Sequence, residues 1–278
     1  MKLTKNIKQM VRMALAEDIG SGDVTADLID ANEQSKATVI CRGNAIIAGK
    51  AWFNEVFYQI DNTVKIEWSI EDGDAVTKNS TLCTLSGNAR ALLSGERAAL
   101  NFLQTLSATA TQTHQYVRCI EGTHARILDT RKTLPNLRLA QKYAVTCGGG
   151  KNHRLALYDM ILIKENHIMA AGSITQAIER ARLLHPALKV EVETENLTEF
   201  IEASNVKADI IMLDNFSLDD MRSAVVQNKG QAIKLEASGG INLTTVRPIA
   251  ETGVDYISVG QITKDITAVD LSMRFSLD

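Results

Sequence analysis

The chain has 278 residues, with 30 Lys and Arg against 33 Asp and Glu, so its net charge is only −3. Apolar residues make up 45% and charged residues 23% of the sequence, which is typical of a folded enzyme and excludes a disordered chain. No apolar run reaches the roughly 20 residues that cross a bilayer, and a mildly acidic chain without interleaved aromatic and basic residues is unsuited to nucleic acid. We therefore expect neither a membrane nor a nucleic acid as a partner.

The cysteines and the N-terminus indicate a cytoplasmic protein with reduced thiols. The four cysteines lie far apart in the sequence and form no Cys-x-x-Cys pair, so neither a zinc site nor a disulfide framework is expected. Residues 1–18 have the pattern of an amphipathic helix and lack the apolar core of a signal peptide.

The first hundred residues predict an α+β sandwich domain, which we place at residues 1–108. Strands are expected over Lys36–Cys41, Ala45–Ala48, Val64–Trp68 and Thr81–Leu85, with a helix over Ala51–Ile60. The stretch Glu71–Lys78 is similar to a biotinyl or lipoyl turn but has no lysine flanked for modification, which favours a structural turn. A long helical region, Ala89–Glu121, follows. The tail alternates like a strand, which would allow residues 268–278 to return to this domain.

Residues 109–267 predict an incomplete six-stranded parallel α/β barrel. Short apolar strands alternate with helical segments, two of which, Ser173–Leu184 and Ser217–Asn228, begin with a capping serine. Alternating strands and helices favour a parallel sheet with right-handed crossovers. The expected strands are Arg126–Leu128, Met160–Ile163, Lys189–Val192, Ile210–Leu213, Ala232–Leu235 and Tyr256–Val259.

Positive charge gathers just after the first two of these strands. From Arg131 to His167 the chain has seven Lys or Arg, two acids and two His. Like charges in one place cost stability unless an anion joins them, so this run predicts a pocket for a carboxylate-rich or phosphorylated ligand. His153 lies among these cations, which favour its neutral form and suit hydrogen bonding to an acid. The alternative is a solvated basic surface.

Carboxylates and glycines follow the later strands, where barrel enzymes carry their chemistry. Glu193 and Asp214 suit Mg²⁺ with its phosphates, or a positive charge developing on a sugar, and they can equally pair with a lysine such as Lys164. Ser238-Gly239-Gly240, expected to open a helix near Leu243, and Gly260 after the next strand predict a phosphate cradle. Turns alone would also explain these glycines.

Nine motifs, spread over nearly the whole chain, together resemble the quinolinate phosphoribosyltransferase family, also called nicotinate-nucleotide pyrophosphorylase (carboxylating). They are Glu17–Thr25, Gly95–Leu103, Asp129–Thr133, Gly148–Arg154, Ile163–His167, Glu191–Glu193, Met212–Asn215, Glu236–Ile241 and Ile257–Gly260. The resemblance implies transfer of phosphoribosyl from 5-phosphoribosyl 1-diphosphate to quinolinate with loss of CO₂. The products are nicotinate mononucleotide and diphosphate, in NAD synthesis, with Mg²⁺ as the cofactor and a homodimer with shared active sites as the assembly.

The resemblance also implies the site residues. The quinolinate carboxylates are expected to meet Arg131, Lys132, His153, Arg154 and Lys164, with Arg97 reaching the site of the neighbouring subunit. The catalytic residues implied are Lys132, Lys164, Glu193 and Asp214, the last two also near the metal and the ribose. The phosphate-binding residues implied are Ser238, Gly239, Gly240 and Gly260. Many members carry a His shortly after Gly260, where this chain has Gln261–Asp265, so Lys264 is our candidate for that phosphate contact.

Three alternatives stay open from the sequence. The first is a molybdenum-transport-associated paralogue with a different substrate, against which the intact basic set argues. The second is a barrel lyase that uses Lys164 as a Schiff base, although such a lysine usually needs an apolar site or a cationic neighbour. The third is a non-catalytic, biotinyl-like carrier.

Overall fold

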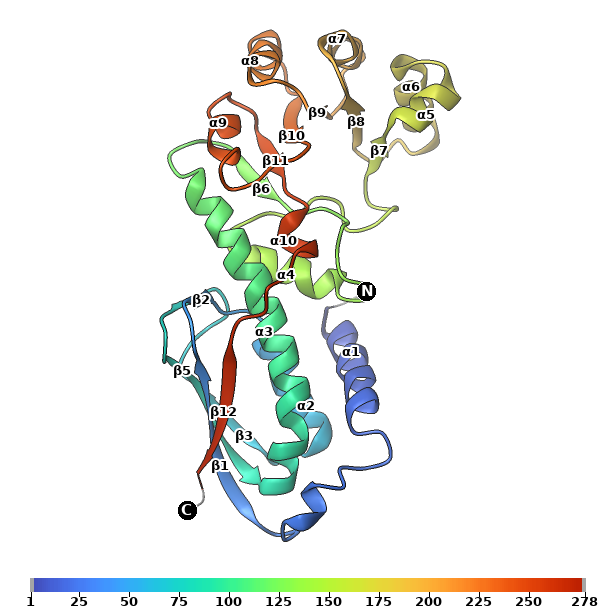
Figure 1. Cartoon of the computed structure of the whole chain (residues 1–278). Coiled ribbons are helices and arrows are strands. Elements are labelled where there is room, and N and C mark those ends of the chain that lie inside the picture. The colour runs from blue at the N-terminus through green and yellow to red at the C-terminus, as the bar shows by residue number, and fades with distance from the viewer. Residues whose placement is uncertain (1–2, 277–278) are drawn as a thin grey trace. The chain divides into compact units, whose positions relative to one another are not determined.

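The computed structural model describes residues 3–276 and divides them between two compact units (Figure 1). Unit 1 comprises Met1–His114, Thr133–Gly149 and Asp265–Asp278, and unit 2 comprises Gln115–Lys132 and Gly150–Lys264. The units follow spatial contacts, so Thr133–Gly149 groups with unit 1 although it lies between two segments of unit 2. The single boundary at residues 108 and 109 stays a prediction.

Unit 1 is an α+β domain built on an antiparallel sheet. Its sheet has the order β12-β1-β5-β3, and β2 and β4 form a separate pair. Its elements are α1 (Leu3–Asp18), the 3₁₀ turn η1 (Ala26–Leu28), β1 (Gln34–Cys41), β2 (Ala45–Ile46), α2 (Lys50–Ile60), β3 (Lys65–Trp68), β4 (Ala75–Val76), β5 (Thr81–Asn88), α4 (Arg138–Cys147) and β12 (Leu271–Ser276). Helix α3 (Ala89–Cys119) belongs mainly to unit 1 and ends in unit 2.

The C-terminal strand completes the sheet of unit 1. Strand β12 pairs antiparallel with β1, from Lys36 opposite Ser276 to Cys41 opposite Leu271. Figure 1 shows this as the red strand beside the blue one. The segment Glu71–Lys78 is a structural turn, because Asp72 Oδ1 accepts the backbone N–H groups of Gly49 and Lys50 at 3.0 and 3.2 Å. Tyr143 donates to the other oxygen of Asp72 at 2.8 Å.

Unit 2 is the incomplete parallel barrel that the sequence predicts. Its six strands have the order β6-β11-β10-β9-β8-β7, so β6 and β7 are the two edges and the barrel is open between them. Its elements are β6 (Arg126–Leu128), β7 (Ile161–Ile163), α5 (Glu165–Ala171), α6 (Ile174–Leu184), β8 (Val190–Thr194), α7 (Leu197–Asn205), β9 (Ile210–Asp214), α8 (Leu218–Gln227), β10 (Lys234–Ser238), α9 (Val246–Ala250), β11 (Tyr256–Ser258) and α10 (Gln261–Lys264). The predicted serine caps are present, since Ser173 and Ser217 accept the N–H groups of Gln176 and Asp220.

Two strands of unit 2 extend further toward the site than the sequence pattern predicts. Strand β8 continues past Val192 to Thr194, and β10 continues past Leu235 to Ser238. Their register holds them to β9, with Glu193 opposite Met212 and Ser238 opposite Asp214. Because side chains alternate along a strand, Glu191 and Glu193 share one face of β8, and Glu236 and Ser238 share one face of β10. The extension of β10 takes in Glu236, and the alternation along β8 puts Glu191 on the side of Glu193, so two more glutamates are buried inside the barrel.

Within residues 3–276, none of the helices is both long enough and apolar enough to span a membrane.

Candidate active site

A cavity of about 310 Å³ lies at the carboxyl ends of the unit 2 strands. Parallel strands bring their carboxyl ends to one edge of a sheet, so residues from distant sequence positions meet there. The cavity is lined by Thr130, Arg131, Lys132, His153, Arg154, Leu162, Lys164, Glu193, Met212, Asp214, Glu236, Ser238 and Ser258. The structure therefore brings the predicted basic residues and the predicted carboxylates into one cavity.

One wall of this cavity carries a concentration of positive charge. Arg131, Arg154 and Lys164 all line it. Burial lowers the pKa of Arg154, and repulsion from the neighbouring charge of Arg131 lowers it further. The ammonium of Lys164 forms an ion pair with Glu193 Oε2. Glu193 therefore forms the ion pair with Lys164 that the sequence suggested, and it also lines the cavity.

A second cavity, of about 450 Å³, adjoins the first and is lined by glycines and amides. The two cavities share Thr130, Lys132, Asp214, Ser238 and Ser258. The residues found only in the second are Asn215, Gly239, Gly240, Ile241, Asn242, Gly260, Gln261 and Lys264. All four residues predicted from the glycine loops, together with Lys264, thus lie around one space next to the basic cavity.

Close packing at Gly239 makes glycine necessary in the loop after β10. Gly239 has a φ of 99°, and a Cβ added there would meet Asn215 Oδ1 at 2.1 Å. Asn215 itself has a φ of 56°, and its N–H donates to the carbonyl of Ser238 at 2.9 Å. The two loops after β9 and β10 are therefore locked together, with exposed backbone facing the second cavity.

The helix after Ser238-Gly239-Gly240 begins later than the sequence pattern predicts. We expected it near Leu243, but α9 starts at Val246 and has only five residues. Asn242 explains the delay, because its side chain accepts the N–H groups of Thr244 and Thr245 at 2.9 and 3.1 Å and holds a turn there. The glycine loop, and not a helix start directly after Gly240, lines this part of the cavity.

Lys132 connects the two cavities. A Cβ added at Gly260 would meet Lys132 Cδ at 3.1 Å, so the lysine side chain runs directly over the loop after β11. Thr263 Oγ1 donates to the carbonyl of Lys132 at 2.9 Å, and the N–H of Lys132 donates to Thr130 Oγ1 at 3.0 Å. These bonds hold the backbone of the Asp129–Thr133 motif against the loop that follows β11.

His153 occupies a buried position at the base of the first cavity. Its Nε2 lies 2.9 Å from Glu191 Oε2 and 3.5 Å from Glu236 Oε2, and the exposed fraction of its side chain is 7%. Its Nδ1 accepts the backbone N–H of Arg154 at 2.8 Å. Ser258 donates its hydroxyl to Glu236 Oε1. We call His153, Glu191 and Glu236 the buried cluster.

The two glutamates of the buried cluster are held partly protonated by their surroundings. Burial raises the pKa of both carboxyl groups. The charge of Glu191 raises the pKa of Glu236 further, and the charge of Glu193 raises that of Glu191, whereas a hydrogen bond with Glu236 lowers it. Arg154 opposes the shift at Glu191, and His153 opposes it at Glu236. Two carboxylates that share a buried site cannot both ionise easily, so the pair holds a proton between them near neutral pH.

Sequence reasoning missed Glu191 and Glu236 as parts of the site. Both lie in the family motifs, but their strands were expected to be apolar or to end before them. The usable signal was an acid inside an otherwise apolar strand. Glu191 lies two residues before Glu193, and Glu236 lies two residues before Ser238. A fully buried acid without a partner is rare, so such a position predicts a polar partner inside the fold.

Arg97 lies in unit 1, on helix α3, with an exposed side chain whose Nη2 is 3.9 Å from Glu96 Oε1. It does not line either cavity of the described part of unit 2. Its predicted role in the site of a neighbouring subunit stays a prediction.

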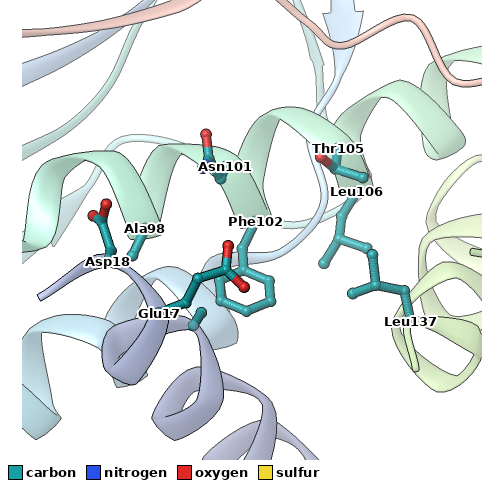
Figure 2. Close-up of a pocket in the computed structure, with 9 residues that line it drawn as sticks. Glu17, Asp18, Ala98, Asn101, Phe102, Thr105, Leu106 and Leu137 are labelled. Carbon is teal, nitrogen blue, oxygen red and sulfur yellow. The ribbon is translucent and has the colours of Figure 1, made fainter. Parts of the chain in front are cut away.

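Unit 1 contains a smaller cavity, of about 190 Å³, between α1 and α3 (Figure 2). Phe102, Leu106 and Leu137 supply its apolar surface, and Glu17 and Asp18 stand at the end of α1. Thus the first family motif, Glu17–Thr25, contributes acids to unit 1 and none of the residues that line the unit 2 cavities.

The fold and the cavities define a class of protein. It is an open parallel α/β barrel with an α+β domain, and its strand ends form a basic cavity joined to a glycine-lined one. Both cavities suit anionic ligands.

The chain belongs to the quinolinate phosphoribosyl transferase family. The model of the C-terminal domain of that family matches residues 109–274, and the model of the N-terminal domain matches residues 23–107. The family predicted from the motifs is therefore confirmed.

Named relatives agree with this assignment. The chain is 42% identical to the probable nicotinate-nucleotide pyrophosphorylase [carboxylating] of Bacillus subtilis (strain 168), over 98% of this chain and 94% of that protein. It is 38% identical to quinolinate phosphoribosyltransferase [decarboxylating] 1b of Nicotiana tabacum, over 99% and 84%. The solved structure of the nicotinate-nucleotide pyrophosphorylase from Francisella tularensis superposes with a TM-score of 0.97 at 46% identity, covering 99% of this chain and 98% of that one.

Proposed function

We propose that this chain transfers phosphoribosyl from 5-phosphoribosyl 1-diphosphate to quinolinate and releases CO₂, giving nicotinate mononucleotide and diphosphate in de novo NAD synthesis. One observation carries the proposal: a cavity with Arg131, Arg154 and Lys164 on its wall opens into a glycine-lined cavity through Lys132 and Asp214. A dicarboxylate and a sugar phosphate held in these two spaces would meet at their boundary. The family membership and the named relatives support the same reaction.

Quinolinate binding follows from the charges of the first cavity. Quinolinate carries two carboxylates, and cations held close together in a partly desolvated cavity gain when a dianion joins them. We assign the two carboxylates to Arg131, Arg154 and Lys164. Positioning the ring nitrogen opposite the sugar turns a bimolecular step into an effectively intramolecular one.

The transfer step breaks one bond and forms another at C1 of the ribose. The ring nitrogen of quinolinate forms the new C–N bond, and diphosphate leaves with the electrons of the C–O bond. Positive charge develops on the ribose in between. Carboxylates fixed beside that charge stabilise it, and Glu193 and Asp214 face the cavities where this occurs.

Decarboxylation needs little help from acids or bases. Once the nitrogen is quaternary, the carboxylate next to it leaves as CO₂ and its bonding electrons remain on the ring carbon, which then takes a proton from water. The cations around the retained carboxylate keep the ring in place during this step.

Mg²⁺ fits the donors around Asp214. This ion prefers oxygen ligands and usually binds through one or two carboxylates together with substrate phosphates. Glu193 and Asp214 offer such oxygens, and Asp214 borders both cavities. When bound, the ion would neutralise the leaving diphosphate.

We also propose that the protein acts as a homodimer in the cytoplasm. The open edge of the barrel exposes Leu157, Tyr158 and Leu184, with exposed fractions of 72%, 68% and 60%, beside the basic wall. Large apolar side chains gathered at one edge favour contact with another chain. The four cysteines are free thiols, which supports a reducing compartment.

The direct test is to incubate the purified protein with quinolinate, 5-phosphoribosyl 1-diphosphate and Mg²⁺ and to separate the products by chromatography. We expect nicotinate mononucleotide, with CO₂ and diphosphate in equal amounts. Omission of either substrate is the control. If no mononucleotide forms, the proposal is wrong. Trapping of a carbonyl substrate on Lys164 by borohydride would indicate a lyase, although the ion pair with Glu193 occupies this lysine and disfavours a Schiff base.

A further inference from the structure

His153 and Glu236 of the buried cluster line the first cavity together with Arg154, and the proposed reaction gives the cluster no role. We propose that Glu191 and Glu236 are positioning residues, which hold the ring of His153 in one tautomer and one orientation and thereby set the place of Arg154 in the cavity. The inference rests on the proposed function for the identity of the ligand that Arg154 meets. It adds two residues, and a different role for His153, to those expected from the family motifs.

The two nitrogens of His153 have partners of opposite kind. Nδ1 accepts the backbone N–H of Arg154 at 2.8 Å, so it carries no proton. A neutral imidazole has one N–H, which must then be on Nε2. Nε2 lies 2.9 Å from Glu191 Oε2 and 3.5 Å from Glu236 Oε2, close enough for these oxygens to stabilise a proton there. The glutamates therefore select the tautomer that Arg154 requires.

The backbone at His153 is held from the other side as well. The N–H of His153 donates to Asp129 Oδ1 at 2.9 Å, and Asp129 is fully buried at the end of β6. Asp129 N–H in turn donates to the carbonyl of Lys151 at 3.2 Å. The backbone N–H groups of His153 and Arg154 are thus both hydrogen-bonded, the first to Asp129 and the second to the ring of His153. The path of the chain into Arg154 is set by these bonds.

Arg154 depends on the cluster in a second way. Its guanidinium is repelled by Arg131 and attracted by the carboxylates of Glu191 and, more weakly, Asp159. Within residues 3–276, a weak bond of 3.4 Å from Nη1 to the carbonyl of Met160 is the one backbone hydrogen bond of the guanidinium. Without the cluster, the repulsion from Arg131 and the freedom of a long side chain would move the guanidinium away from its place on the cavity wall.

The same three side chains have the composition of a metal site, since one ligand atom of each lies within 4.8 Å of the others. The hydrogen bond at Nδ1 decides against that use of the cluster. A metal on Nε2, with Nδ1 still accepting from Arg154, would require an imidazole without any proton. Histidine ligands of metals instead donate their second N–H to an acceptor. The geometry therefore points to a proton, and not a metal ion, on Nε2 of His153.

The experiment compares Glu236→Leu, which removes one of the two carboxyl groups beside Nε2 and the partner of Ser258, with Glu236→Gln, which keeps an oxygen beside Nε2 and an amide for Ser258. We expect Glu236→Leu to raise the KM for quinolinate at least about fivefold, because Nε2 then has Glu191 alone beside it and the buried hydroxyl of Ser258 loses its acceptor, so the ring and the chain into Arg154 are held less firmly. The kcat and the KM for 5-phosphoribosyl 1-diphosphate should stay within about twofold. The lost contacts weaken the binding of quinolinate equally in the ground state and in the transition state, and such a loss raises only the KM for quinolinate. Glu236→Gln should stay within about twofold throughout.

Thr252→Val is the matched control. Thr252 is a buried residue of unit 2 outside the site, and its hydroxyl donates to the carbonyl of Ile249 at 2.7 Å. It tests whether loss of any buried hydrogen bond in this unit changes the KM, and we expect no change. The inference is wrong if Glu236→Leu and Glu236→Gln behave alike, or if Glu236→Leu lowers kcat and both affinities together. A wild-type protein that does not convert quinolinate would refute the proposed function instead.

A second measurement needs neither activity nor the leucine variant. In protein labelled with ¹⁵N-histidine, the ring signals of His153 can be assigned by their loss in His153→Gln. We expect a neutral ring at neutral pH, with the proton on Nε2 in the wild type and in Glu236→Gln. An imidazolium, a proton on Nδ1, or a stoichiometric metal that is lost with Glu236→Gln would each overturn the inference.

Discussion

Glu193 and Asp214 face the same cavity but have different neighbours. Glu193 is paired with Lys164, whereas Asp214 Oδ2 accepts only the amide of the adjacent Asn215 at 3.0 Å among the bonds of the described chain. Lys164 already offsets the charge of Glu193, so Asp214 is the freer of the two to meet positive charge on a sugar or a metal.

We predict that Asp214→Asn and Glu193→Gln lower kcat by about 100-fold, because each removes a charge that acts mainly in the transition state. The KM for quinolinate should change by no more than about threefold. Steady-state kinetics with both substrates measure this. Asp219→Asn, on the exposed surface of α8 and paired with Arg222, is the control and should match the wild type. A raised KM with unchanged kcat would show that these acids serve binding alone.

The carboxyl group of Glu236 predicts a dependence of stability on pH. Burial, followed by the charge of Glu191, raises its pKa from 4.5 to about 8, while His153 and Ser258 oppose the rise. Between these two values the folded protein holds a proton that the unfolded chain has lost. This group therefore makes the free energy of unfolding fall as the pH rises through that window, by at most about 1.4 kcal/mol per pH unit.

Urea unfolding at several pH values across that window measures the effect. We expect Glu236→Gln, which cannot ionise, to flatten the fall relative to the wild type, while the exposed-acid variant Asp219→Asn keeps it. If the wild type and Glu236→Gln have parallel profiles, the carboxyl group of Glu236 is ionised in the folded protein like any exposed acid.

At the scale of elements, the loops after β9, β10 and β11 act as one structure. The loop after β10 approaches Asn215 so closely that only glycine fits at position 239, and the loop after β11 touches Lys132. Such loops on rigid strands can place backbone N–H groups around a phosphate with little entropy left to lose.

We predict that Gly239→Ala raises the KM for 5-phosphoribosyl 1-diphosphate about tenfold or more, because the new methyl group must push Asn215 away and open the loop. Gly230→Ala is a matched control. Gly230 also has a positive φ, of 86°, but a Cβ there meets no atom within 4 Å. Gly230→Ala should lose about 1–2 kcal/mol of stability to backbone strain, and Gly239→Ala should lose more because of its clash with Asn215. Only Gly239→Ala should change the KM for 5-phosphoribosyl 1-diphosphate. An equal KM in the two variants would show that the loop after β10 does not take part in phosphate binding.

At the scale of the whole molecule, our dimer proposal makes Arg97 a residue of the partner's site. Arg97→Ala and Lys164→Ala should each be nearly inactive alone. In a co-refolded equal mixture, about half of the dimers combine both chains, and one of the two sites in each is intact. Activity should then return to roughly a quarter of the wild-type value. An inactive mixture in which heterodimers are demonstrated would show that Arg97 does not act across an interface.

Most elements of both units could be predicted from local patterns. The strand Arg126–Leu128 and the serine caps of α6 and α8 were found because a short apolar run or a capping residue acts on its immediate neighbours. The two-residue strand β4 was missed, since Ala75 and Val76 are too short a run to stand out without their partner β2. The start of α9 was misplaced because the turn at Asn242 competes with a helix there.

The sequence by itself determined the family, the six-strand barrel and the list of charged and glycine residues at the strand ends, because each of these leaves a local pattern. Only the tertiary structure decided what those residues face. The end of β10 depends on hydrogen bonds to β9, and that pairing carries Glu236 into the barrel. His153 meets Glu191 and Glu236 from separate strands, and its orientation follows from burial that no nearby residue provides. Long-range pairing chooses which partners a side chain has, and those partners set its protonation and its role.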